Sequence, residues 1–396
     1  KALELHIEDL TKSYSPRTDE KEEVTMKINS KPHVSLRLGV LGSGQAGGRM
    51  AEVFYKFGYS TGAINTAKQD LDGLTLPDTN KLVLEYTLSG SGKDIEIGAA
   101  ALEANLEQVK EFAASILEDT DVAVLTTSLG GGSGAGSSVQ LVELLAEFNK
   151  PLLVICAMPG SFDDSQSKYN ATQTLQKLSD QSNRGLISSL IVIDNAKIEN
   201  TYPNLPPNKF WEVSNKSAIE PLHLFNTVTA QSSDLEVMDA MDLSRALLEA
   251  GSCALFGSMK ITKEEYEQDE TGLLSAMIRK LPDALPADDF DLKESQAIGI
   301  LVTATPEVLS GVPYSNINYL FKFIADEYDS SRSFKGIYEI PTTGGEPSDD
   351  ITVSFIFSGM GLPSRRIEAL TMIAKAKQQS GALGKLMGNN KVDRKR

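Results

Sequence analysis

The glycines between Leu129 and Ser137, in the run LGGGSGAGS, are the residues whose types and spacing best suit chemistry. They follow the apolar stretch 122–125 and precede a helical pattern of apolar residues at 139–145. A strand that turns through glycines into a helix directs several backbone N–H groups, and the positive end of the helix dipole, at one point. Glycine suits this turn because a Cβ would block close approach and the left-handed backbone conformation. The run therefore predicts a loop that binds an anionic phosphate, since a flexible linker would not separate a buried strand from an amphipathic helix.

A second glycine cluster ends the first apolar stretch of the chain. The run Gly42-Ser-Gly44-Gln-Ala-Gly47 fits the fingerprint G-x-G-x-x-G of dinucleotide-binding folds, with an expected strand before it and an expected helix after it. A nicotinamide site also needs an acid for the ribose at the end of the next strand, and Asn65-Thr66 offers none. The fingerprint alone is therefore weak support for a nicotinamide-dependent enzyme.

A third cluster, Ser89-Gly-Ser-Gly-Lys-Asp94, has part of the spacing of a P-loop. Thr87 stands where the first P-loop glycine belongs, and Asp94 replaces the Ser or Thr that binds magnesium. The nucleophile elbow G-x-S-x-G fails as well, because Ala135 occupies the position of its closing glycine. The chain thus has three glycine turns, and none matches a common nucleotide fold or a serine hydrolase.

The composition excludes several other classes of chemistry. The chain has three histidines and two cysteines in 396 residues, which leaves little for a histidine-centred triad, a zinc site or a disulfide framework. With 54 acidic and 38 basic residues, direct binding of nucleic acid by the body of the protein is disfavoured. No apolar run approaches the roughly 20 residues that span a bilayer, and no signal-peptide pattern opens the chain. We therefore expect a cytoplasmic protein without a membrane span.

Short apolar runs alternate with amphipathic segments from Leu36 onward, which is typical of an α/β protein with a parallel sheet. A long helix is expected over 209–230, where Pro221 should kink or split it, and a last helix over 363–379. Apolar runs in the last third of the chain predict a smaller α+β unit. The expected strands are 36–41, 60–65, 81–85, 122–127, 151–157, 189–194, 252–262, 297–304, 334–340 and 351–357.

These patterns divide the chain into five parts. The first is polar and charge-mixed and is expected to be an extension outside the core. The last ends in a tail that is basic from Lys385 onward. The parts are an N-terminal extension (1–35), a Rossmann-like nucleotide-binding domain (36–208), a central helix with the loop after it (209–250), a smaller α+β domain (251–362), and a C-terminal helix with the basic tail (363–396).

Together the three glycine turns resemble the tubulin/FtsZ superfamily, whose nucleotide site is built from such loops. The run GGGSGAG at 130–136 is similar to the tubulin signature GGGTGTG, with Ser133 and Ala135 in place of the two threonines. The run GQAG at 44–47 is similar to the first tubulin phosphate loop, and 90–98 resembles the FtsZ loop GAGANPEVG at unbroken length. These loops occur in the order that the family has, so together they are far more specific than each is alone.

A fourth loop extends the resemblance. Asn65-Thr66, followed by Gln69, resembles the FtsZ loop NTDAQ, although Ala67 stands where the acid would be. The resemblance implies a GTP-binding domain for GTP or GDP, with Mg²⁺ held through the phosphates and water and with Gln69 as the one candidate side chain toward the ion. The nucleotide-binding residues that it implies are Gly44, Gln45, Ala46, Gly47, Arg49, Asn65, Gln69, Gly90, Ser91, Gly92, Lys93, Gly130, Gly131, Gly132, Ser133, Gly134, Asp163, Asn195, Trp211 and Asn215.

The last four of these residues would hold the base and ribose. The family stacks an aromatic residue at the start of its central helix on guanine and bonds the base edge with an Asn or Asp one turn later. Trp211 and Asn215 have the i, i+4 spacing that puts both on one helical face. Asn195 matches the family's base- and ribose-contacting asparagine, and Asp163 its ribose acid, although Ser167 replaces the basic residue four positions on. The alternatives are a core tryptophan, a solvated asparagine and ordinary loop residues.

Catalysis would depend on Asp239 and Asp242, in the run VMDAMDL at 237–243. This run resembles the FtsZ catalytic loop N-x-D-x-x-D, with Val237 in place of the asparagine. Spacing of i, i+3 at a helix start puts both carboxylates on one side, where the helix dipole keeps them ionised. The resemblance implies that they project into the next subunit's site and polarise the water that attacks the γ-phosphate. The alternative role is helix capping, which is common for aspartate.

An active site completed by the next subunit requires head-to-tail assembly, a heterologous contact that does not close and so makes filaments. The run VIDNAK at 192–197 and the SNK at 214–216 are similar to the TubZ-type tubulins of plasmids and bacteriophages. We therefore expect a GTP-hydrolysing cytoskeletal polymer that segregates or positions plasmid or phage DNA in a bacterial cytoplasm. The basic tail fits an element that binds a DNA-binding adaptor or a phage or plasmid complex, or else a solubilising terminus.

Two alternatives to this function stay open. The first is a tubulin-like scaffold filament that binds GTP and assembles without releasing phosphate, which Val237 and Ala67 make conceivable. The second, far behind, is the NAD-dependent oxidoreductase, which rests on the run 42–47 alone and predicts binding of NAD(H) in place of GTP.

Overall fold

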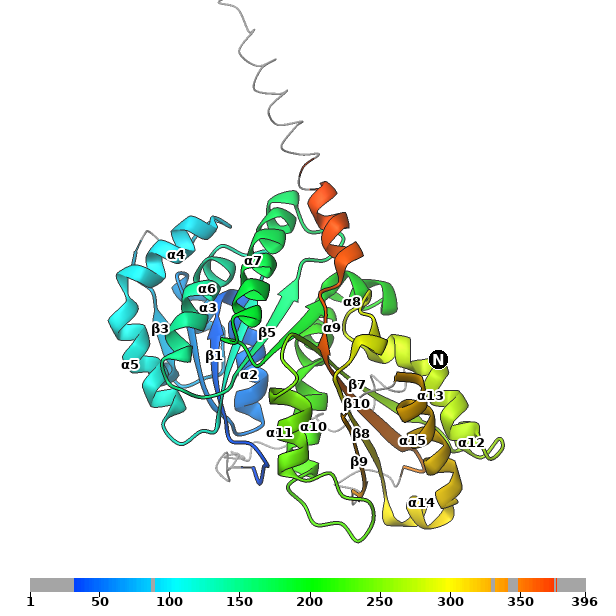
Figure 1. Ribbon diagram of the computed structural model, residues 1–396. Coiled ribbons are helices and arrows are strands. Elements are labelled where there is room, and N and C mark those ends of the chain that lie inside the picture. The colour runs from blue at the N-terminus through cyan, green and yellow to red at the C-terminus, as the bar shows by residue number, and fades with distance from the viewer. Residues whose placement is uncertain (1–31, 87–89, 329–331, 341–347, 374, 376–396) are drawn as a thin grey trace, which may run out of the picture.

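The computed structural model describes residues 32–86, 90–328, 332–340, 348–373 and 375 (Figure 1). The expected N-terminal extension up to residue 31 and the basic tail from Lys385 lie outside these residues. Among the described residues, none of the helices combines the length and the apolar character that crossing a bilayer requires.

One sheet runs through the whole molecule, with its strands in the order β3-β2-β1-β4-β5-β6-β7-β10-β8-β9. Neighbouring strands are parallel from β3 to β7, β10 is antiparallel to both β7 and β8, and β9 is parallel to β8. This confirms an α/β fold with a parallel-dominated sheet. The strands are β1 (Leu38–Ser43), β2 (Ser60–Asn65), β3 (Lys81–Val83), β4 (Val122–Ser128), β5 (Leu152–Met158), β6 (Ser189–Asp194), β7 (Cys253–Ile261), β8 (Ala297–Ala304), β9 (Arg332–Glu339) and β10 (Ile351–Met360).

Helices cover both faces of the sheet in the parallel half and in the mixed half (Figure 1). In the parallel half they are α2 (Gly44–Lys56), α3 (Lys68–Asp72), α4 (Ile95–Ala104), α5 (Leu106–Leu117), α6 (Ser133–Ala146), α7 (Ser165–Asn183) and α8 (Asn195–Thr201). The two halves are connected through α9 (Pro207–Lys216), α10 (Ile219–Val228) and α11 (Ala240–Leu248). The mixed half contributes α12 (Lys263–Tyr266), α13 (Gly272–Ala284), α14 (Pro306–Gly311) and α15 (Tyr314–Tyr328), and short 3-10 turns lie at Asp78–Asn80 and Leu292–Glu294.

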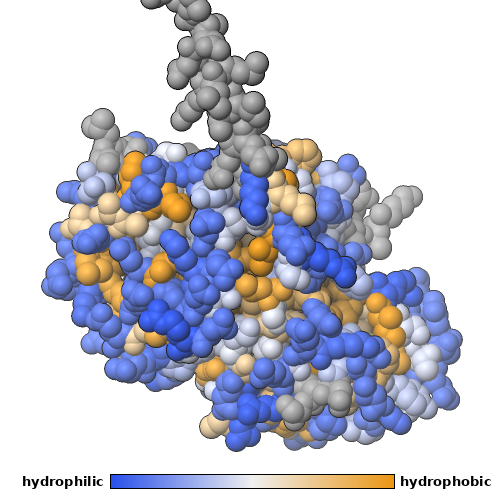
Figure 2. All heavy atoms as spheres, turned by 45° about the horizontal axis from the view of Figure 1, so that its top comes forward, coloured by the Kyte–Doolittle hydropathy of each residue, from blue (hydrophilic) through white to orange (hydrophobic). Residues whose placement is uncertain are grey.

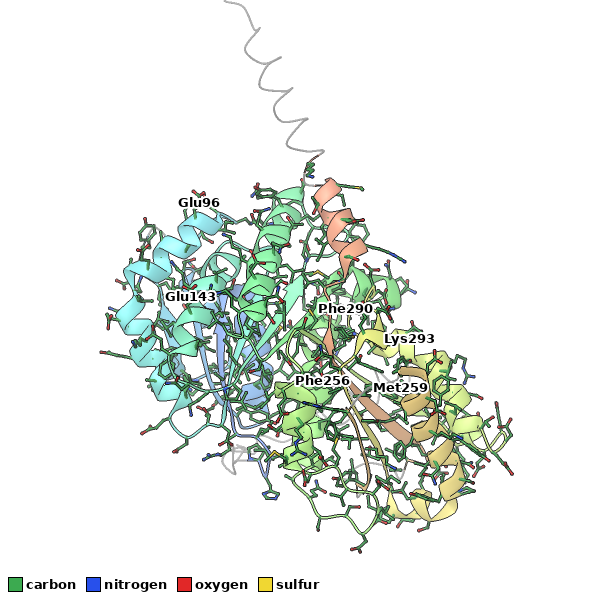
Figure 3. All side chains as sticks on the ribbon, viewed as in Figure 1. Glu96, Glu143, Phe256, Met259, Phe290 and Lys293 are labelled. Carbon is green, nitrogen blue, oxygen red and sulfur yellow. The ribbon has the colours of Figure 1, made fainter. Side chains whose placement is uncertain are left out.

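Parallel strands that are covered on both faces have to be apolar along their length, and β4 and β5 are buried almost throughout. The core on one face is continuous across both halves of the sheet, because it contains Phe54 of α2, Phe225 of α10 and Phe256 of β7. The rings of Phe225 and Phe256 meet edge to face with their centroids 6.4 Å apart. Figure 3 shows Phe256 in the interior, whereas Glu96 and Glu143 lie on the outer helices. This shared core fixes the two halves against each other.

The expected central helix is divided into α9 and α10, and the break lies at residues 217–218 rather than at Pro221. Pro221 is the third residue of α10, where its missing N–H costs nothing because that group has no intrahelical partner. The last expected helix begins after Pro363 and is helical over 364–373; its remaining residues up to 379, apart from residue 375, lie outside the described part.

Candidate functional site

Two helices begin with free backbone donors at the carboxyl end of the parallel strands. α2 follows β1 and α6 follows β4, and in the described structure neither helix start is capped by a side chain or carries an acid in its first turn. A Cβ on Gly44, whose φ is +74°, would lie 2.7 Å from the backbone N of Gly134, so the two helix starts touch. Their N–H groups and dipoles converge on one volume, which suits an anionic phosphate.

The N-termini of the neighbouring helices α4 and α7 already have a carboxylate on their backbone donors. Asp94 caps α4 by accepting hydrogen bonds from the N–H groups of Glu96 and Ile97, and Asp164 caps α7 through the N–H of Ser167. Since a capping carboxylate satisfies the same donors that a phosphate would use, these two helices repel a second anion. The contrast between capped and uncapped helices therefore favours α2 and α6 as the predicted phosphate cradle.

The Ser133 hydroxyl joins three of the predicted loops. It lies 2.5 Å from the Thr66 hydroxyl and 3.1 Å from that of Ser91. The loops approach so closely that a Cβ on Gly132 would lie 2.2 Å from Ser91 Oγ. The structure thus brings the predicted phosphate loops together; their residues are Gly44, Gln45, Ala46, Gly47, Asn65, Gly90, Ser91, Gly92, Lys93, Gly130, Gly131, Gly132, Ser133 and Gly134. Arg49 is exposed farther along α2, and Gln69 is exposed on α3.

Lys93 connects the loop at 90–94 to the start of α7. Its ammonium forms an ion pair with Asp164, and hydrogen bonding to Lys93 lowers the pKa of Asp164 to about 2. The buried Asn170 donates to the carbonyl oxygens of both Lys93 (2.9 Å) and Gly130 (3.1 Å). The loops on this side of the cradle are therefore held by a buried amide as well as by an exposed ion pair.

Asp70 was not foreseen from the sequence, and it links two of the predicted residues. One of its carboxylate oxygens accepts from Gln45 Nε2 and the other from Asn65 Nδ2, each at 3.0 Å. Asp70 lies one helical turn after Ala67, on α3. The i, i+3 spacing from Ala67 to Asp70 could have revealed it, because residues one helical turn apart lie on the same side of a helix.

Asp163 lies in the loop 159–164 between β5 and α7. Its carboxylate accepts from the N–H of Gly160 (2.8 Å), and the N–H of Ser161 donates to Glu199 of α8 (2.7 Å). The buried Lys168 donates to the carbonyl of Ser161 (2.6 Å). The loop is thus fixed from three sides, and the ribose contact of Asp163 remains a prediction.

Asn195, the first residue of α8, is buried, and its side-chain oxygen accepts a hydrogen bond from Ser214 of α9 at 2.6 Å. Trp211 is 40% exposed, and Asn215 is partly buried on the same helix. Ser214 was missed because a serine in mid-helix gives no signal by itself. Its bond holds α8 against α9, so that Asn195 and the Trp211 region lie beside the carboxyl end of β6.

A buried ion pair stabilises the same region. Arg366, from the C-terminal helix, donates through Nε and Nη2 to the two oxygens of Asp194 (2.7 and 3.1 Å) and through Nη2 to the carbonyl of Pro159 (3.0 Å). Asp194 also caps α8 through the N–H of Ala196. Burial raises the pKa of Asp194, although the Arg366 guanidinium opposes the shift. The C-terminal helix is thereby joined to the loops that carry Asp163 and Asn195.

Asp239 and Asp242 form a capping box at the start of α11. Asp239 Oδ1 accepts from the N–H groups of Met241 (2.8 Å) and Asp242 (2.9 Å), and Asp242 Oδ2 accepts from the N–H of Asp239 (3.3 Å). The capping role that the sequence offered as an alternative is therefore present. The capping bonds leave Asp239 exposed at the surface.

The two aspartates lie at the opposite end of the subunit from the glycine loops. The chain just before β1 bonds to the region where α10 ends, through Ser35 N to the Asn226 carbonyl (2.9 Å) and His33 Nε2 to the Ala230 carbonyl (2.9 Å). The loop 229–239 therefore starts at the amino end of β1, whereas α2 starts at its carboxyl end. Six residues of strand separate these ends by about 20 Å. The start of this loop therefore lies about one strand length away from the predicted phosphate loops.

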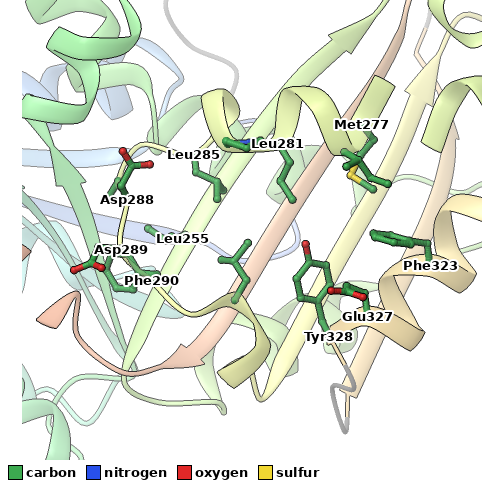
Figure 4. Close-up of a pocket in the computed structure, with 14 residues that line it drawn as sticks. Leu255, Met277, Leu281, Leu285, Asp288, Asp289, Phe290, Phe323, Glu327 and Tyr328 are labelled. Atoms are coloured by element: carbon green, nitrogen blue, oxygen red, sulfur yellow. The ribbon is translucent and has the colours of Figure 1, made fainter. Parts of the chain in front are cut away.

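A cavity of about 380 Å³ lies elsewhere, between α13, α15 and β7 in the mixed half (Figure 4). Its walls are mainly apolar, with Met277, Leu281 and Phe323 among them, and Asp288 and Glu327 stand at its edge. It shares no residue with the predicted nucleotide site.

Residues 37–203 match the Tubulin/FtsZ family, GTPase domain. This match and the converging glycine loops define the class of this part of the chain: residues 37–203 form a GTPase domain of the tubulin/FtsZ family. A GTPase domain acts on GTP, which decides against the nicotinamide alternative.

Relatives with this class of domain align over most of the chain. The tubulin-like protein CetZ of Pyrococcus horikoshii is 26% identical over 348 residues, which cover 86% of this chain and 90% of the relative. The tubulin-like protein TubZ of Bacillus cereus is 22% identical over 377 residues, covering 89% of this chain and 86% of the relative.

Solved structures share the fold along the same length. The GTPγS-form protofilament of TubZ from Bacillus thuringiensis serovar israelensis superposes with a TM-score of 0.75 at 19% identity, covering 92% of this chain and 96% of that one. The GTPγS-bound protofilament of CetZ2 from Haloferax volcanii gives a TM-score of 0.72 at 19% identity, covering 88% and 100%.

Proposed function

We propose that this chain is the subunit of a GTP-hydrolysing filament, in which Asp239 and Asp242 of one subunit complete the nucleotide site of the next. The observation that carries this proposal is that the loop bearing the two aspartates starts at the amino end of β1, about 20 Å from the glycine loops at its carboxyl end. Such a subunit has half of an active site at each end. Head-to-tail contact joins the halves, and because that contact does not close on itself, it propagates into a filament.

The residues would divide the reaction between them. The uncapped N–H groups of α2 and α6 would bind the phosphate oxygens and stabilise the charge that develops on them. Asp239 of the neighbouring subunit would orient and polarise the attacking water. In the described structure its capping bonds use Oδ1, so we assign the water to Oδ2. The water oxygen bonds to the γ-phosphorus as the bond to the β-phosphate oxygen breaks, and the proton leaves toward the carboxylate.

A magnesium ion fits this site only as an ion carried by the nucleotide. Among the residues that the structure describes, no three His, Cys, Asp or Glu side chains are grouped so as to hold a metal by themselves. Gln69 and the bridging carboxylate of Asp70 supply the hard oxygen donors that Mg²⁺ prefers, next to the phosphate cradle. Bound there, the ion would neutralise phosphate charge.

The experiment that tests the proposal measures GTP hydrolysis and pelleting against protein concentration. We expect a threshold concentration below which turnover per subunit is absent. Asp239→Asn is the sharper variant than Asp239→Ala, because asparagine caps a helix about as well as aspartate. We expect it to form filaments but to lose turnover by about a hundredfold or more. Asp234→Asn, an exposed residue of the same loop, is the control.

The outcomes separate the candidates. Turnover strictly proportional to concentration, with nothing pelleting, would contradict the filament proposal. Assembly without turnover in the unaltered protein would support the scaffold alternative, which the capping box and Val237 favour.

We further propose that the filament acts in the cytoplasm of a bacterium and segregates or positions plasmid or phage DNA. The support is similarity to TubZ of Bacillus cereus, and to a structure described as a type III plasmid segregation TubZ, with a TM-score of 0.70 at 20% identity. We assign contact with an adaptor or a phage or plasmid complex to the basic tail. The test is the loss rate of an unselected plasmid that carries the gene, compared with its Asp239→Asn form; equal loss rates would contradict this role.

A further inference from the structure

Phe162 lies at the nucleotide end of the subunit, with its ring in solvent. Its side chain is 94% exposed, although the loop that bears it is fixed by the bonds of Gly160, Ser161 and Lys168. Figure 2 brings this end forward and shows a largely hydrophilic face on which hydrophobic side chains form separate patches. A large apolar side chain held out by a rigid loop marks an interaction site more strongly than one on a mobile segment.

The opposite end carries a matching apolar patch around the two aspartates. Leu235, Val237 and Met241 are 48%, 47% and 56% exposed and lie on both sides of Asp239 in the sequence. The backbone that bears them is fixed by bonds to β9, from Ile337 N to the Glu236 carbonyl (2.8 Å) and from Ser233 Oγ to the Ile337 carbonyl (2.8 Å). We call these three side chains the loop patch.

Acidic side chains are prominent at both ends. Asp234, Glu236, Asp239 and Asp242 stand at one end, while Asp163 and Asp164 stand at the other, so that carboxylates face carboxylates. Lys93 is paired with Asp164 and Lys335 with Glu236, which removes two of the cations that could oppose them. Burial of apolar side chains is the favourable term that remains, and it does not decline with salt.

We propose that Phe162 of one subunit packs into the loop patch of the next copy of this chain and so brings Asp239 over its nucleotide. The inference rests on the proposed function, because Asp239 can reach a neighbour's phosphates only when the end bearing Phe162 faces the end bearing the loop patch. Phe162 is next to Asp163 in sequence, and the loop patch brackets Asp239, so each half of the active site carries one half of the apolar contact. The occupant of both surfaces is therefore a second copy of the chain.

Disulfide trapping tests this contact directly, because the chain offers no competing thiol. Its two cysteines, Cys156 and Cys253, are buried, and burial raises the pKa of both thiols. Phe162→Cys would be mixed in turn with Leu235→Cys, Val237→Cys and Met241→Cys, under GTP and copper phenanthroline, which oxidises two thiols to one disulfide. A disulfide requires Cα atoms within about 7 Å, so trapping reports a close contact.

We expect at least one mixture to give covalent dimers and each variant alone to give none, since a head-to-tail contact pairs unlike surfaces. Leu106→Cys, exposed on the outer helix α5, is the control partner for Phe162→Cys and should not be trapped. Efficient pelleting without a disulfide in any of the three mixtures would overturn the inference and leave the filament intact. Failure of the unaltered protein to pellet with GTP would instead overturn the proposed function.

Truncation of the ring supplies the second measurement. We expect Phe162→Ala to raise the critical concentration at least tenfold at both low and high salt, without changing GTP affinity below that concentration. Leu106→Ala should change neither quantity. Weaker GTP binding by unassembled Phe162→Ala would show that the ring serves the nucleotide of its own subunit and would overturn the inference.

Discussion

The hydroxyl of Tyr338, on β9, bonds to both backbone groups of Met238, donating to its carbonyl at 2.6 Å and accepting from its N–H at 3.1 Å. Met238 immediately precedes Asp239, and both Tyr338 and Met238 are buried. A single phenol thus fixes the backbone from which the candidate catalytic carboxylate projects. The mixed half of the sheet thereby positions a residue whose chemistry belongs to the neighbouring subunit.

Tyr338→Phe should therefore remove the hydrogen bonds that fix the loop, while the aromatic ring still fills its place in the core. Two buried backbone groups lose their partner, which costs about 1–3 kcal/mol of unfolding free energy. We expect faster hydrogen exchange at the amides of Met238 and Asp239, a kcat about tenfold lower, and unchanged GTP affinity of the unassembled subunit. Tyr266→Phe is the control, since it removes a partly buried hydroxyl bond to the Asp349 carbonyl away from this loop. A kcat that falls equally in both variants would contradict a positioning role.

Asp70→Asn should weaken nucleotide binding. The carboxylate accepts from two amide side chains, Gln45 and Asn65, and an asparagine in its place can accept with only one of its two terminal atoms. Loss of one such bond corresponds to about a tenfold higher Kd for GTP. The control is Asp72→Asn on the same helix, whose carboxylate pairs with the exposed Lys68. Titration with a fluorescent GTP analogue measures both, and equal affinities would show that Asp70 acts on folding alone.

Arg366→Gln should be strongly destabilising, while Arg365→Gln should not. The side chains of Arg366 and Asp194 are 18% and 5% exposed, so that loss of the guanidinium leaves a buried carboxylate unpaired, at a cost of about 3 kcal/mol. Arg365 is 90% exposed, and its replacement should change stability by less than about 0.5 kcal/mol. Thermal unfolding measures the difference. The deficit of Arg366→Gln should shrink as pH falls and Asp194 binds a proton; a deficit independent of pH would contradict this explanation.

His223 on α10 should make stability depend on pH between about 4 and 6.5. Burial lowers the pKa of His223 to about 4, while its ring stacks on Phe57 with the centroids 4.0 Å apart and bonds to the Tyr59 hydroxyl. Burial raises the pKa of Tyr59 to about 12, so that this neighbour stays neutral.

Between these pH values the unfolded chain binds the proton and the folded chain does not. The free energy of unfolding therefore falls as pH decreases from about 6.5 to about 4, by about 3 kcal/mol for this residue. His223→Asn should remove that part of the pH dependence, whereas His33→Asn, at the exposed His33, should leave it. Identical pH profiles for wild-type protein and His223→Asn would contradict the prediction.

Sequence reasoning identified the glycine turns that it predicts to be phosphate loops because their glycines obey local geometry. The close approach of Gly44 to Gly134 and of Gly132 to Ser91 tolerates no Cβ, so the residue type reports the structure directly. The strands were found for a similar reason, because a strand buried on both faces has to be apolar along its length. In both cases the residue types within one short segment are enough to predict its local structure.

The supporting residues were missed because their partners are far away in the sequence. Arg366 is 172 positions from Asp194, and Tyr338 is 100 positions from Met238; no periodicity within either segment encodes such a pair. The break between α9 and α10 was misplaced for a different reason. A proline in the first turn of a helix is favourable, so Pro221 indicated a helix start nearby rather than an interruption at its own position.

The sheet is continuous, yet its strands are not joined equally. β5 and β6 pair over six residues and β7 and β10 over nine, but β6 and β7 pair at two positions only, Leu190 with Cys253 and Ile191 with Ala254. This seam separates the half that would hold the nucleotide from the half that fixes the loop of Asp239. The part that would bind GTP and the part that would trigger its hydrolysis in a neighbour are therefore joined mainly by the packing of the shared core and only slightly by strand pairing.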